Sequence, residues 1–293
     1  MIITTCGNSE LIAKRLAKQL KVKYSPLTIA SFPDGDIYLK FNTKVKGKKV
    51  VIVQSFQPKS DMSLFDIVFA GETAKNLGAK KVILVAPYLA YMRQDKRFNP
   101  GEAISSRIMA KMLNGAVDKI ITIDPHLHRY NSLKDIFTIS TKKLSANRSI
   151  AEHIKKKFKN PVIIGPDAES YQWAEAIAKV VNCPVTVCKK TRISSRHVVE
   201  KMIDKITIAG KQVIIVDDIV STGHTMIEAA KTARKMKAVS VTAIGVHGLF
   251  VENAIKKMDK YFDDIITTNC IKHSTNKIDM TPLLLQELRK EKR

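Results

Sequence analysis

The chain has 293 residues, 45% of them hydrophobic, and its 50 Lys and Arg against 27 Asp and Glu give a formal net charge of +23. This length suits two domains of roughly 100–200 residues each, and the apolar fraction excludes a disordered chain. Because no apolar run reaches about 18 uninterrupted residues, no transmembrane helix is expected, and residues 1–20 do not show the pattern of a secretory signal.

The four cysteines form no CxxC pair, so the sequence predicts neither a zinc site nor a disulfide framework. We therefore expect reduced thiols in a cytoplasmic protein. The basic excess favours an anionic partner, either a phosphorylated metabolite or nucleic acid. Much of it lies in short bursts such as residues 153–159, where a solvated helix face is the simpler explanation. Aromatic residues, 6% of the chain, are not interleaved with these bursts, which leaves a nucleic-acid-binding module the weakest alternative.

Apolar runs alternate along the chain with amphipathic stretches. Two stretches place apolar or small residues on one helix face, and these are Leu64, Val68 and Gly71, then Met226, Ala229, Ala230 and Ala233. Near-continuous apolar strands between such helices indicate parallel sheets that helices cover on both faces. The predicted strands are residues 2–6, 37–41, 50–56, 82–88, 120–124, 162–165, 185–188, 213–218, 241–246 and 264–268.

One unit of strand, loop, helix and strand occurs twice, first over residues 48–91 and again over residues 211–250. This repetition predicts a duplicated α/β domain. We place the domains at residues 1–145 and 146–293, with the boundary near residues 142–148. The final helical stretch, residues 283–293, could pack on either half.

The stretch from Val213 to Thr225, VIIVDDIVSTGHT, ends a predicted buried strand with two aspartates. Parallel sheets bind ligands beyond the carboxyl ends of their strands. The small residues that follow, at the start of a helix, offer free N–H groups and a favourable dipole to a phosphate. Asp217 and Asp218 can accept hydrogen bonds from sugar hydroxyls or face a metal. The pattern therefore indicates a sugar phosphate site.

Five further segments carry polar residues beside predicted strands or turns. Residues 87–98 hold Arg93 and Gln94, which could grip phosphate oxygens and read a base edge. The others are a turn with Asp34, Gly35 and Asp36, a strand end with Asp124 and His126, a strand end with Asp167, and a basic segment with Lys189, Lys190 and Arg192. Read alone, the two basic segments could equally be solvated surface.

The stretch VIIVDDIVSTGHT resembles the 5-phosphoribosyl-binding loop that phosphoribosyltransferases share with ribose-phosphate pyrophosphokinases. The segments 32–41, 87–98, 123–130, 165–170 and 189–194 resemble those of ribose-phosphate pyrophosphokinases, in the same order, and the similarity spans nearly the whole chain. The KTR form of the last segment is most similar to archaeal-type members. The resemblance implies two tandem, related type I phosphoribosyltransferase-like domains, each a mostly parallel sheet flanked by helices.

The resemblance also implies an activity, the transfer of the diphosphoryl group of ATP to the 1-hydroxyl of ribose 5-phosphate, with AMP as the second product. Lys190 and Arg192 are then catalytic, and Mg²⁺ is the cofactor. The implied ATP-binding residues are Asp34, Gly35, Asp36, Arg93 and Gln94, and the N-terminal domain carries them. The implied ribose 5-phosphate-binding residues are Arg192, Asp217, Asp218, Ser221, Thr222, Gly223, His224 and Thr225.

His126 and Asp167 are implied to be metal-site residues, and Asp167 is the better inner ligand because magnesium prefers oxygen. Members of this family form homo-oligomers. Two positions depart from the family pattern, because Asp36 replaces a common glutamate and His224 stands where a second glycine is usual. If residue 224 required a positive φ angle, histidine would fit it less easily than glycine.

Two alternatives remain at this point. A phosphoribosyltransferase would use the same loop with a base or another nucleophile in place of ATP, but a type I transferase usually has one such domain. A non-catalytic regulatory homologue of the synthetase is the other alternative. The presence of Arg93, Gln94, Lys190, Arg192 and the Asp217 loop argues against it.

Overall fold

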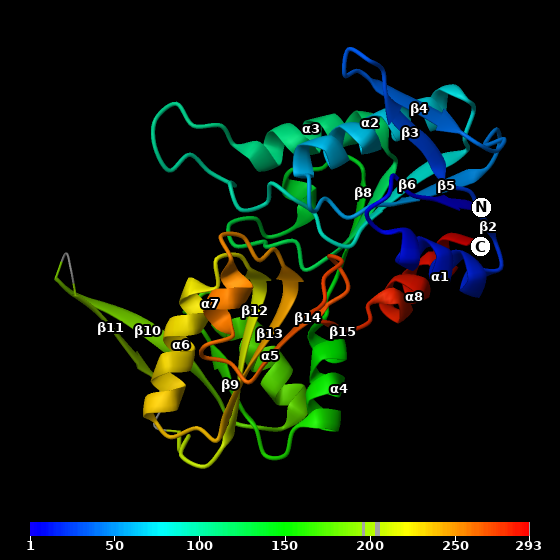
Figure 1. Ribbon diagram of the computed structural model, residues 1–293. Coiled ribbons are helices and arrows are strands. Elements are labelled where there is room, and N and C mark those ends of the chain that lie inside the picture. Colours follow the sequence, from blue (N-terminus) through cyan, green and yellow to red (C-terminus); the bar gives the residue numbers. More distant parts are fainter. Residues whose placement is uncertain (195–196, 203–205, 293) are drawn as a thin grey trace. The chain divides into compact units, whose positions relative to one another are not determined.

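The computed structural model spans residues 1–293 and describes all of them except 195–196, 203–205 and 293, with side chains left undescribed over 189–205 (Figure 1). The chain divides into two compact units. The first contains Met1–Leu144, Cys270–Lys272 and Met280–Arg293, and the second contains Ser145–Asn269 and His273–Asp279. No helix among the described residues is long and apolar enough to cross a membrane.

Unit 1 is built on a six-stranded, fully parallel sheet. Its strand order is β2 (Lys23–Tyr24), β1 (Ile2–Thr4), β5 (Lys49–Val53), β6 (Lys81–Ala86), β7 (Lys119–Ile123) and β8 (Ser140–Leu144). Two helices on one side of the sheet contact each other, α1 (Glu10–Leu20) and α8 (Thr281–Lys292), and two lie on the other side, α2 (Ser60–Asn76) and α3 (Ser105–Ala116) (Figure 1). The remaining elements are a hairpin of β3 (Leu27–Ser31) and β4 (Ile37–Phe41), and a 3₁₀ turn at Leu133–Asp135.

Unit 2 is built on a seven-stranded sheet that is parallel except where β10 and β11 pair. Its strand order is β11 (His197–Met202), β10 (Val185–Ser194), β9 (Val162–Gly165), β12 (Gln212–Val220), β13 (Ser240–Gly248), β14 (Asp264–Thr268) and β15 (Asn276–Ile278). The helices of this unit are α4 (Asn147–Lys157), α5 (Tyr171–Val181), α6 (His224–Lys235) and α7 (Ala254–Met258).

The six strands of the first sheet correspond to six of the seven strands of the second, and β11 has no counterpart among the described residues. The order β2-β1-β5-β6-β7-β8 in unit 1 matches β10-β9-β12-β13-β14-β15 in unit 2. Within this correspondence β5 matches β12, so Gln54 and Ser55 of unit 1 stand where unit 2 has Asp217 and Asp218. The predicted duplication of a mostly parallel α/β domain is therefore confirmed, and only one copy carries the pair of acids.

Five strands escaped prediction, and they are β2, β3, β8, β11 and β15. Those with a described burial pattern are largely exposed or very short, and β8 has the sequence STKKL. Their pairing comes from neighbouring strands, because an apolar pattern is nearly absent from their own residues. The predicted strand 185–188 also proved longer, since β10 continues to Ser194 and pairs antiparallel with β11.

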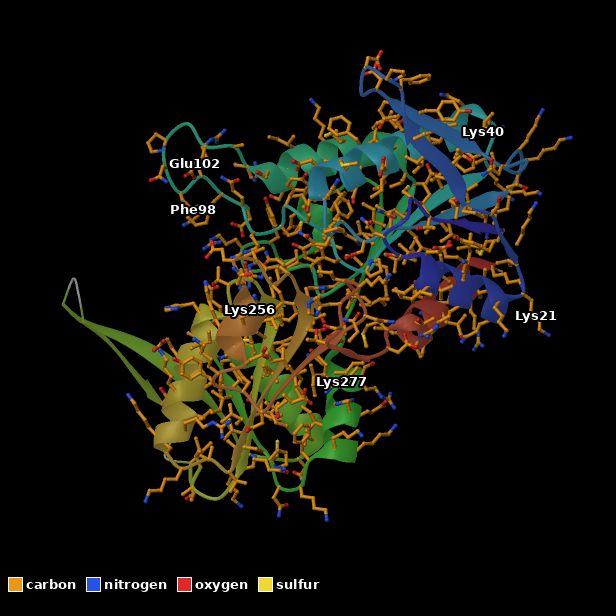
Figure 2. All side chains as sticks on the ribbon, in the orientation of Figure 1. Lys21, Lys40, Phe98, Glu102, Lys256 and Lys277 are labelled. Atoms are coloured by element: carbon orange, nitrogen blue, oxygen red, sulfur yellow. The ribbon has the colours of Figure 1, made fainter. Side chains whose placement is uncertain are left out.

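Lysine side chains account for much of the basic excess on the surface. Lys21, Lys40, Lys256 and Lys277 extend from the ribbon, and all four are exposed (Figure 2). Both cores are apolar and strand-based, since the residues of β5 and β12 from Val50 to Val53 and from Val213 to Val216 are buried. The charge is therefore carried outside the cores, as the sequence indicated for its basic helical bursts.

The last helix, α8, belongs to unit 1, and this decides the question that the sequence left open. Its Glu287 and Glu291 carboxylates lie 3.4 and 2.7 Å from the ammonium of Lys119, which is 8% exposed. Lys81 binds Glu291 at 2.9 Å, and Lys290 binds Glu287 at 2.8 Å. Burial raises the pKa of Glu287, but Lys290 and Lys119 outweigh it and the net pKa is lowered. The helix is thus tied to β7 by a shielded ion cluster.

Replacing Lys119 by alanine is expected to lower the free energy of unfolding by about 3 kcal/mol, because Glu287 and Glu291 would lose the buried ammonium between them, and Glu287 would keep only Lys290, whose side chain is 65% exposed. Urea titration at neutral pH measures the change. As a control, Lys179→Ala removes an exposed i,i+4 pair with Glu175 and is expected to cost less than about 0.5 kcal/mol. Equal losses for the two variants would contradict a structural role for the cluster.

Candidate functional site

The carboxyl ends of β9 and β12 bring three carboxylates together in unit 2. Asp217 lies in β12 opposite Gly245 of β13, and the next residue is Asp218. Asp167 follows β9, which pairs with β12 through Ile164 and Ile215. Because parallel strands end at the same edge of a sheet, residues 50 positions apart meet here. The sequence placed Asp167 and Asp217 in separate motifs, and the structure makes them neighbours.

The three acids repel one another, and this shows in the pKa of Asp217. Burial raises the pKa of Asp217 well above its ordinary value, and the charges of Asp218 and Asp167 raise it further. The backbone N–H of Asp218 donates to Asp217 Oδ1 at 2.9 Å and opposes the shift without cancelling it. A cation or a hydrogen-bond donor placed here would be stabilised by the same charges.

Asp167 is held in a tight turn before α5. Its Oδ1 accepts from the backbone N–H of Ser170 at 3.0 Å, while its own N–H donates to Ser170 Oγ at 3.1 Å. A side chain at Gly165 would place its Cβ only 2.9 Å from Ser170 Oγ, so this close turn requires glycine. The turn fixes the carboxylate at the sheet edge that Asp217 occupies.

The loop from Ser221 to Thr225 connects β12 to the amino end of α6. Gly223 is the residue before the helix, at a φ angle of 72°, and a Cβ there would lie 2.6 Å from Met258 Sδ. Gly223 has no side chain to cap the helix, and Thr222 Oγ1 accepts from the N–H of His224 at 3.5 Å. The amino end of the helix brings its N–H groups and the positive end of its dipole to the loop, as in known anion sites.

His224 is the first residue of α6, it is exposed, and its φ angle is not positive. The backbone at residue 224 therefore does not require a positive φ angle, and histidine is not strained there. The left-handed position is occupied by Gly223 instead, one residue earlier. Histidine at 224 is consequently compatible with the helix, and the family's second glycine is not needed for backbone geometry.

Backbone hydrogen bonds from residues 249–251 support this loop, and they were not predicted from the sequence. The backbone N–H groups of Leu249 and Phe250 donate to Val220 O, and that of Val251 donates to Ser221 O at 3.2 Å. Gly245 gives room for this packing, because a Cβ there would lie 2.5 Å from Val220 Cγ2. The glycines of the run IGVHG, residues 244–248, were the available signal, since glycines within a strand mark a close approach.

Lys190 and Arg192 lie in the part of β10 whose side chains the structure does not describe. The backbone of this segment runs as a strand paired with β11, and Lys190 lies opposite Glu200. Antiparallel pairing therefore extends the strand that was predicted over residues 185–188. The roles expected for both side chains stay predictions.

In unit 1, Arg93 and Gln94 lie in the segment between β6 and α3. Arg93 is exposed and Gln94 is half-buried. Ser105 Oγ donates to Gln94 Oε1 at 2.8 Å, and Ser106 Oγ donates to Gln94 O at 3.2 Å. The carbonyl end of the Gln94 amide is thus engaged, which leaves its NH₂ group to donate elsewhere.

Asp95 ties this segment to the one that contains His126. Its side chain is 2% exposed and pairs with Arg129 at 2.9 Å. Tyr130 donates to Asp95 O at 3.2 Å and shares a hydrogen bond with Ser106 at 2.9 Å. Further along, Glu102 accepts from the N–H of Phe98, and Figure 2 labels both in the same loop. Arg93 and Gln94 were predicted from the sequence. The network around Asp95 was not, because Asp95 and Arg129 lie 34 positions apart in the chain.

His126 follows β7 with a φ angle of 53°, two residues after Asp124 with 36°. Its Nδ1 lies 3.0 Å from His128 Nε2, and the two ring centroids are 3.9 Å apart. Such backbone angles are uncommon for residues other than glycine and are retained where the surroundings hold them.

Asp34, Gly35 and Asp36 form the turn of the β3–β4 hairpin, as predicted. The N–H of Phe32 donates to Asp36 O at 2.8 Å, and Asp34 Oδ1 accepts from the N–H of Asp36 at 3.2 Å. Among the described residues of unit 1, no hydrogen bond or ion pair joins Asp34 or Asp36 to Arg93. The turn is exposed. Within the described part of unit 1, no hydrogen bond or ion pair connects it to the other predicted ATP-binding residues.

Comparison with known proteins agrees with this geometry. A family model described as the N-terminal domain of ribose phosphate pyrophosphokinase matches residues 1–116, and a phosphoribosyl transferase domain model matches residues 132–284. The crystal structure of phosphoribosylpyrophosphate synthetase from Mycobacterium smegmatis is similar in fold, with a TM-score of 0.88 at 23% identity, covering 99% of this chain and 98% of that one. The fold and the loop after β12 therefore define a protein of two phosphoribosyltransferase-like domains.

Similarity to curated proteins shows which family the chain belongs to. The ribose-phosphate pyrophosphokinase of Methanothermobacter thermautotrophicus is 35% identical over 97% of this chain and 98% of its own length. That of Pyrococcus furiosus is also 35% identical, over 94% and 98%. The chain belongs to the ribose-phosphate pyrophosphokinase family. This membership confirms the resemblance, including its archaeal character, and the prediction that the chain is an enzyme.

The variant Asp217→Asn is expected to be more stable than the wild-type protein at neutral pH when no cation is present. The folded-state pKa of Asp217 is raised, so its contribution to stability is complete below the ordinary carboxyl pKa and is lost as pH rises through the folded value. The gain from asparagine should therefore disappear as pH falls.

Urea titrations in a chelator across this pH range measure the difference. Asp36→Asn, at an exposed turn, is the control and is expected to change stability by less than about 0.5 kcal/mol. A variant Asp217→Asn that is less stable at neutral pH would contradict the assignment of repulsion to these carboxylates.

Proposed function

We propose that this protein transfers the diphosphoryl group of ATP to the 1-hydroxyl of ribose 5-phosphate, giving 5-phosphoribosyl 1-diphosphate and AMP. The observation that carries the proposal is the end of β12 in unit 2, where two carboxylates are followed by a short loop that leads to the amino end of α6. Acceptors for sugar hydroxyls beside donors for a phosphate suit a sugar phosphate. Family membership, with relatives named for this activity, supports the same reaction.

The residues of unit 2 are assigned to ribose 5-phosphate. The N–H groups and hydroxyls of the segment from Ser221 to Thr225 bind the 5-phosphate, with Gly223 letting the chain turn into α6. Asp217 and Asp218 accept hydrogen bonds from the ribose hydroxyls, and Arg192 contributes a positive charge. His224 adds a donor at the first turn of the helix.

The residues of unit 1 are assigned to ATP. Arg93 binds phosphate oxygens, and Gln94 donates its free NH₂ group to a ring nitrogen or a phosphate, since Ser105 holds its carbonyl oxygen. The turn with Asp34, Gly35 and Asp36 is proposed as a second contact. The domains are accordingly proposed as residues 1–145 for ATP and 146–293 for ribose 5-phosphate, with the last helix, α8, packed on the N-terminal half.

Mg²⁺ is the proposed cofactor, and the donors of unit 2 fit it. Magnesium prefers oxygen ligands and keeps several waters, and three carboxylates converge where Asp217 has a raised pKa. Asp167 and Asp217 would hold the ion directly or through water. His126 is proposed as a further metal-site residue. When bound, the ion neutralises the charge of the polyphosphate.

The chain's own residues then supply positioning and charge. The ribose 1-hydroxyl, oriented by Asp217 and Asp218, attacks the β-phosphorus of ATP in line, and AMP departs with the α-phosphate. Negative charge grows on the transferred oxygens, and the cationic groups of Lys190 and Arg192 stabilise it. Positioning and such electrostatic stabilisation provide most of the catalysis in phosphoryl transfer.

The first test is the reaction itself. Purified protein incubated with ATP, ribose 5-phosphate and Mg²⁺ is expected to release AMP in step with 5-phosphoribosyl 1-diphosphate, and a chelator should stop both. Chromatography of nucleotides measures the products. A phosphoribosyltransferase would form neither product from these substrates, and a regulatory homologue would leave ATP intact, so absence of AMP rejects the proposal.

Replacing Lys190 by alanine is expected to lower kcat by about 10²–10³-fold with smaller changes in either KM, because a group acting in the transition state is lost. Lys189→Ala is the matched control, since it removes the adjacent positive charge, and a much smaller loss is expected. Steady-state assays give the comparison. A variant Lys190→Ala with more than half the wild-type kcat would remove the proposed role.

We further propose a homo-oligomer in the cytoplasm. Helix α2 exposes an apolar row of Met62, Phe65 and Phe69, which are 54%, 48% and 44% exposed and lie about one turn apart. The four cysteines are free thiols, which accords with a reducing compartment. Sedimentation velocity of the wild-type chain against Phe65→Glu tests the assembly.

A further inference from the structure

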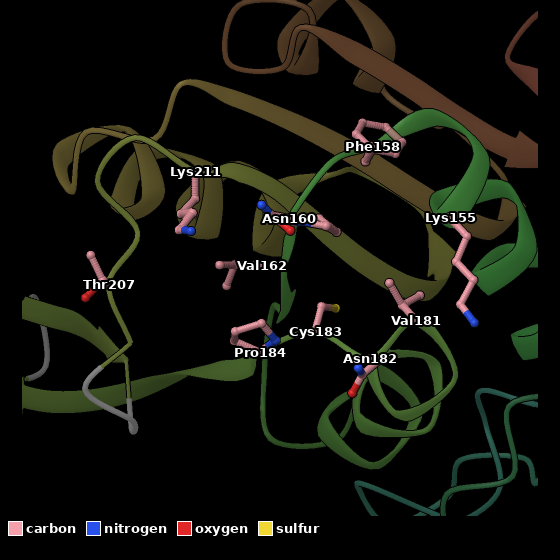
Figure 3. A pocket seen from close by; sticks show the side chains of 11 residues that line it. Lys155, Phe158, Asn160, Val162, Val181, Asn182, Cys183, Pro184, Thr207 and Lys211 are labelled. Carbon is pink, nitrogen blue, oxygen red and sulfur yellow. The ribbon is translucent and has the colours of Figure 1, made fainter.

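A pocket in unit 2 lies at the edge of the sheet opposite to the three carboxylates. Its volume is ≈ 260 Å³, and it opens where β9, β10 and β12 begin. Figure 3 shows Lys155 and Lys211 on opposite sides, with Val162, Cys183 and Pro184 between them. The remaining lining residues are Phe158, Asn160, Pro161, Val181, Asn182 and Thr207.

The charged residues that line this pocket, among those with described side chains, are the lysines Lys155 and Lys211. Neither forms an ion pair with a residue whose side chain the structure describes. Lys155 lies in the last turn of α4, where a lysine also stabilises the negative end of the helix dipole. Lys211 is half-buried in the loop before β12, so no helix end accounts for its charge.

The surroundings increase the positive potential. Lys156, Lys157 and Lys159 follow Lys155 along the chain. Burial lowers the pKa of His153, and the nearby charges of Lys157, Lys277 and Lys156 lower it further against the opposing Asp264. An anion entering the pocket would therefore gain from several cations at once.

The floor and the size of the pocket limit what it can hold. Phe158, Val162, Val181 and Pro184 offer an apolar surface, and Asn182 and Thr207 add polar groups at the margin. The volume is just below the roughly 300–1,000 Å³ of sites for drug-sized ligands, which favours a ligand smaller than a nucleotide. A single ring or short carbon chain with one charged group is the size that remains.

We propose that this pocket binds a small organic anion, whose apolar body lies on Phe158 and Val162 and whose phosphate or carboxylate pairs with Lys211 and Lys155. Cys183 takes no covalent part, since burial raises its pKa to about 11 and keeps the thiol protonated. Asp217 lies six positions after Lys211, a distance of about 20 Å along the strand. The ligand is therefore separate from ribose 5-phosphate, and its binding does not depend on the proposed reaction.

Titration of the ¹⁵N-labelled full chain with phenyl phosphate tests the proposal, with ribose 5-phosphate present at saturation to occupy the loop after β12. The amide signals of Asn160, Asn182 and Lys211 are expected to shift saturably at millimolar or lower concentrations. Benzyl alcohol, which has the ring without the charge, should bind at least about tenfold more weakly, as expected for loss of a charge-assisted contact. A parallel titration with benzoate tells whether a phosphate or a carboxylate is preferred.

Lys211→Gln is expected to weaken phenyl phosphate binding about tenfold, and Lys155→Gln to weaken it less. Lys156→Gln is the matched control, because it removes a neighbouring charge on α4 that does not line the pocket. The proposal is overturned if these amide signals do not shift, if only signals from Ser221 to Thr225 shift, or if all three variants bind equally.

Discussion

The carboxylate of Asp217 is held at the end of a buried parallel strand, against two other carboxylates. That arrangement costs stability, since burial and the charges of Asp218 and Asp167 raise its pKa. It persists because the surrounding backbone is held in place. β12 is paired on both sides, with β9 and β13, and the N–H groups of Leu249 and Phe250 donate to Val220 at its end. A rigid sheet edge that keeps like charges together creates affinity for hydroxyl donors and cations. The chemistry proposed for the protein depends on this constraint.

Duplication followed by divergence explains how the two units differ. They share one strand order, but the position of Asp217 is occupied in unit 1 by Gln54, whose Oε1 accepts from Thr5 at 3.3 Å. Unit 1 has no acid pair at this place to repel a polyphosphate. Its own polar network instead centres on the buried Asp95, which holds the segment of Arg93 and Gln94 against Arg129 and Tyr130. The same scaffold thus carries an acidic site in one copy and a basic segment in the other.

Much of the fold followed from the sequence because buried parallel strands are almost continuously apolar. The runs of β5, β6, β7 and β12 could be recognised without neighbours. Strands such as β8 could not, since STKKL has no apolar pattern and becomes a strand by pairing with β7. The continuation of β10 beyond residue 188 was missed for the same reason, because it depends on pairing with β11. Local sequence does not contain the partner that supplies these hydrogen bonds.

By itself the sequence determined the α/β class, the internal repeat and the motif of Asp217 with its hydroxyl loop, because each depends on residues adjacent in the chain. Only the tertiary structure decided that Asp167 lies beside Asp217, that Arg129 pairs with Asp95, and that α8 belongs to unit 1 through Lys119. Those relations join residues 34 to 172 positions apart. Spacing along the chain carries no information about them, since the sheet order and the packing of helices set which distant residues meet.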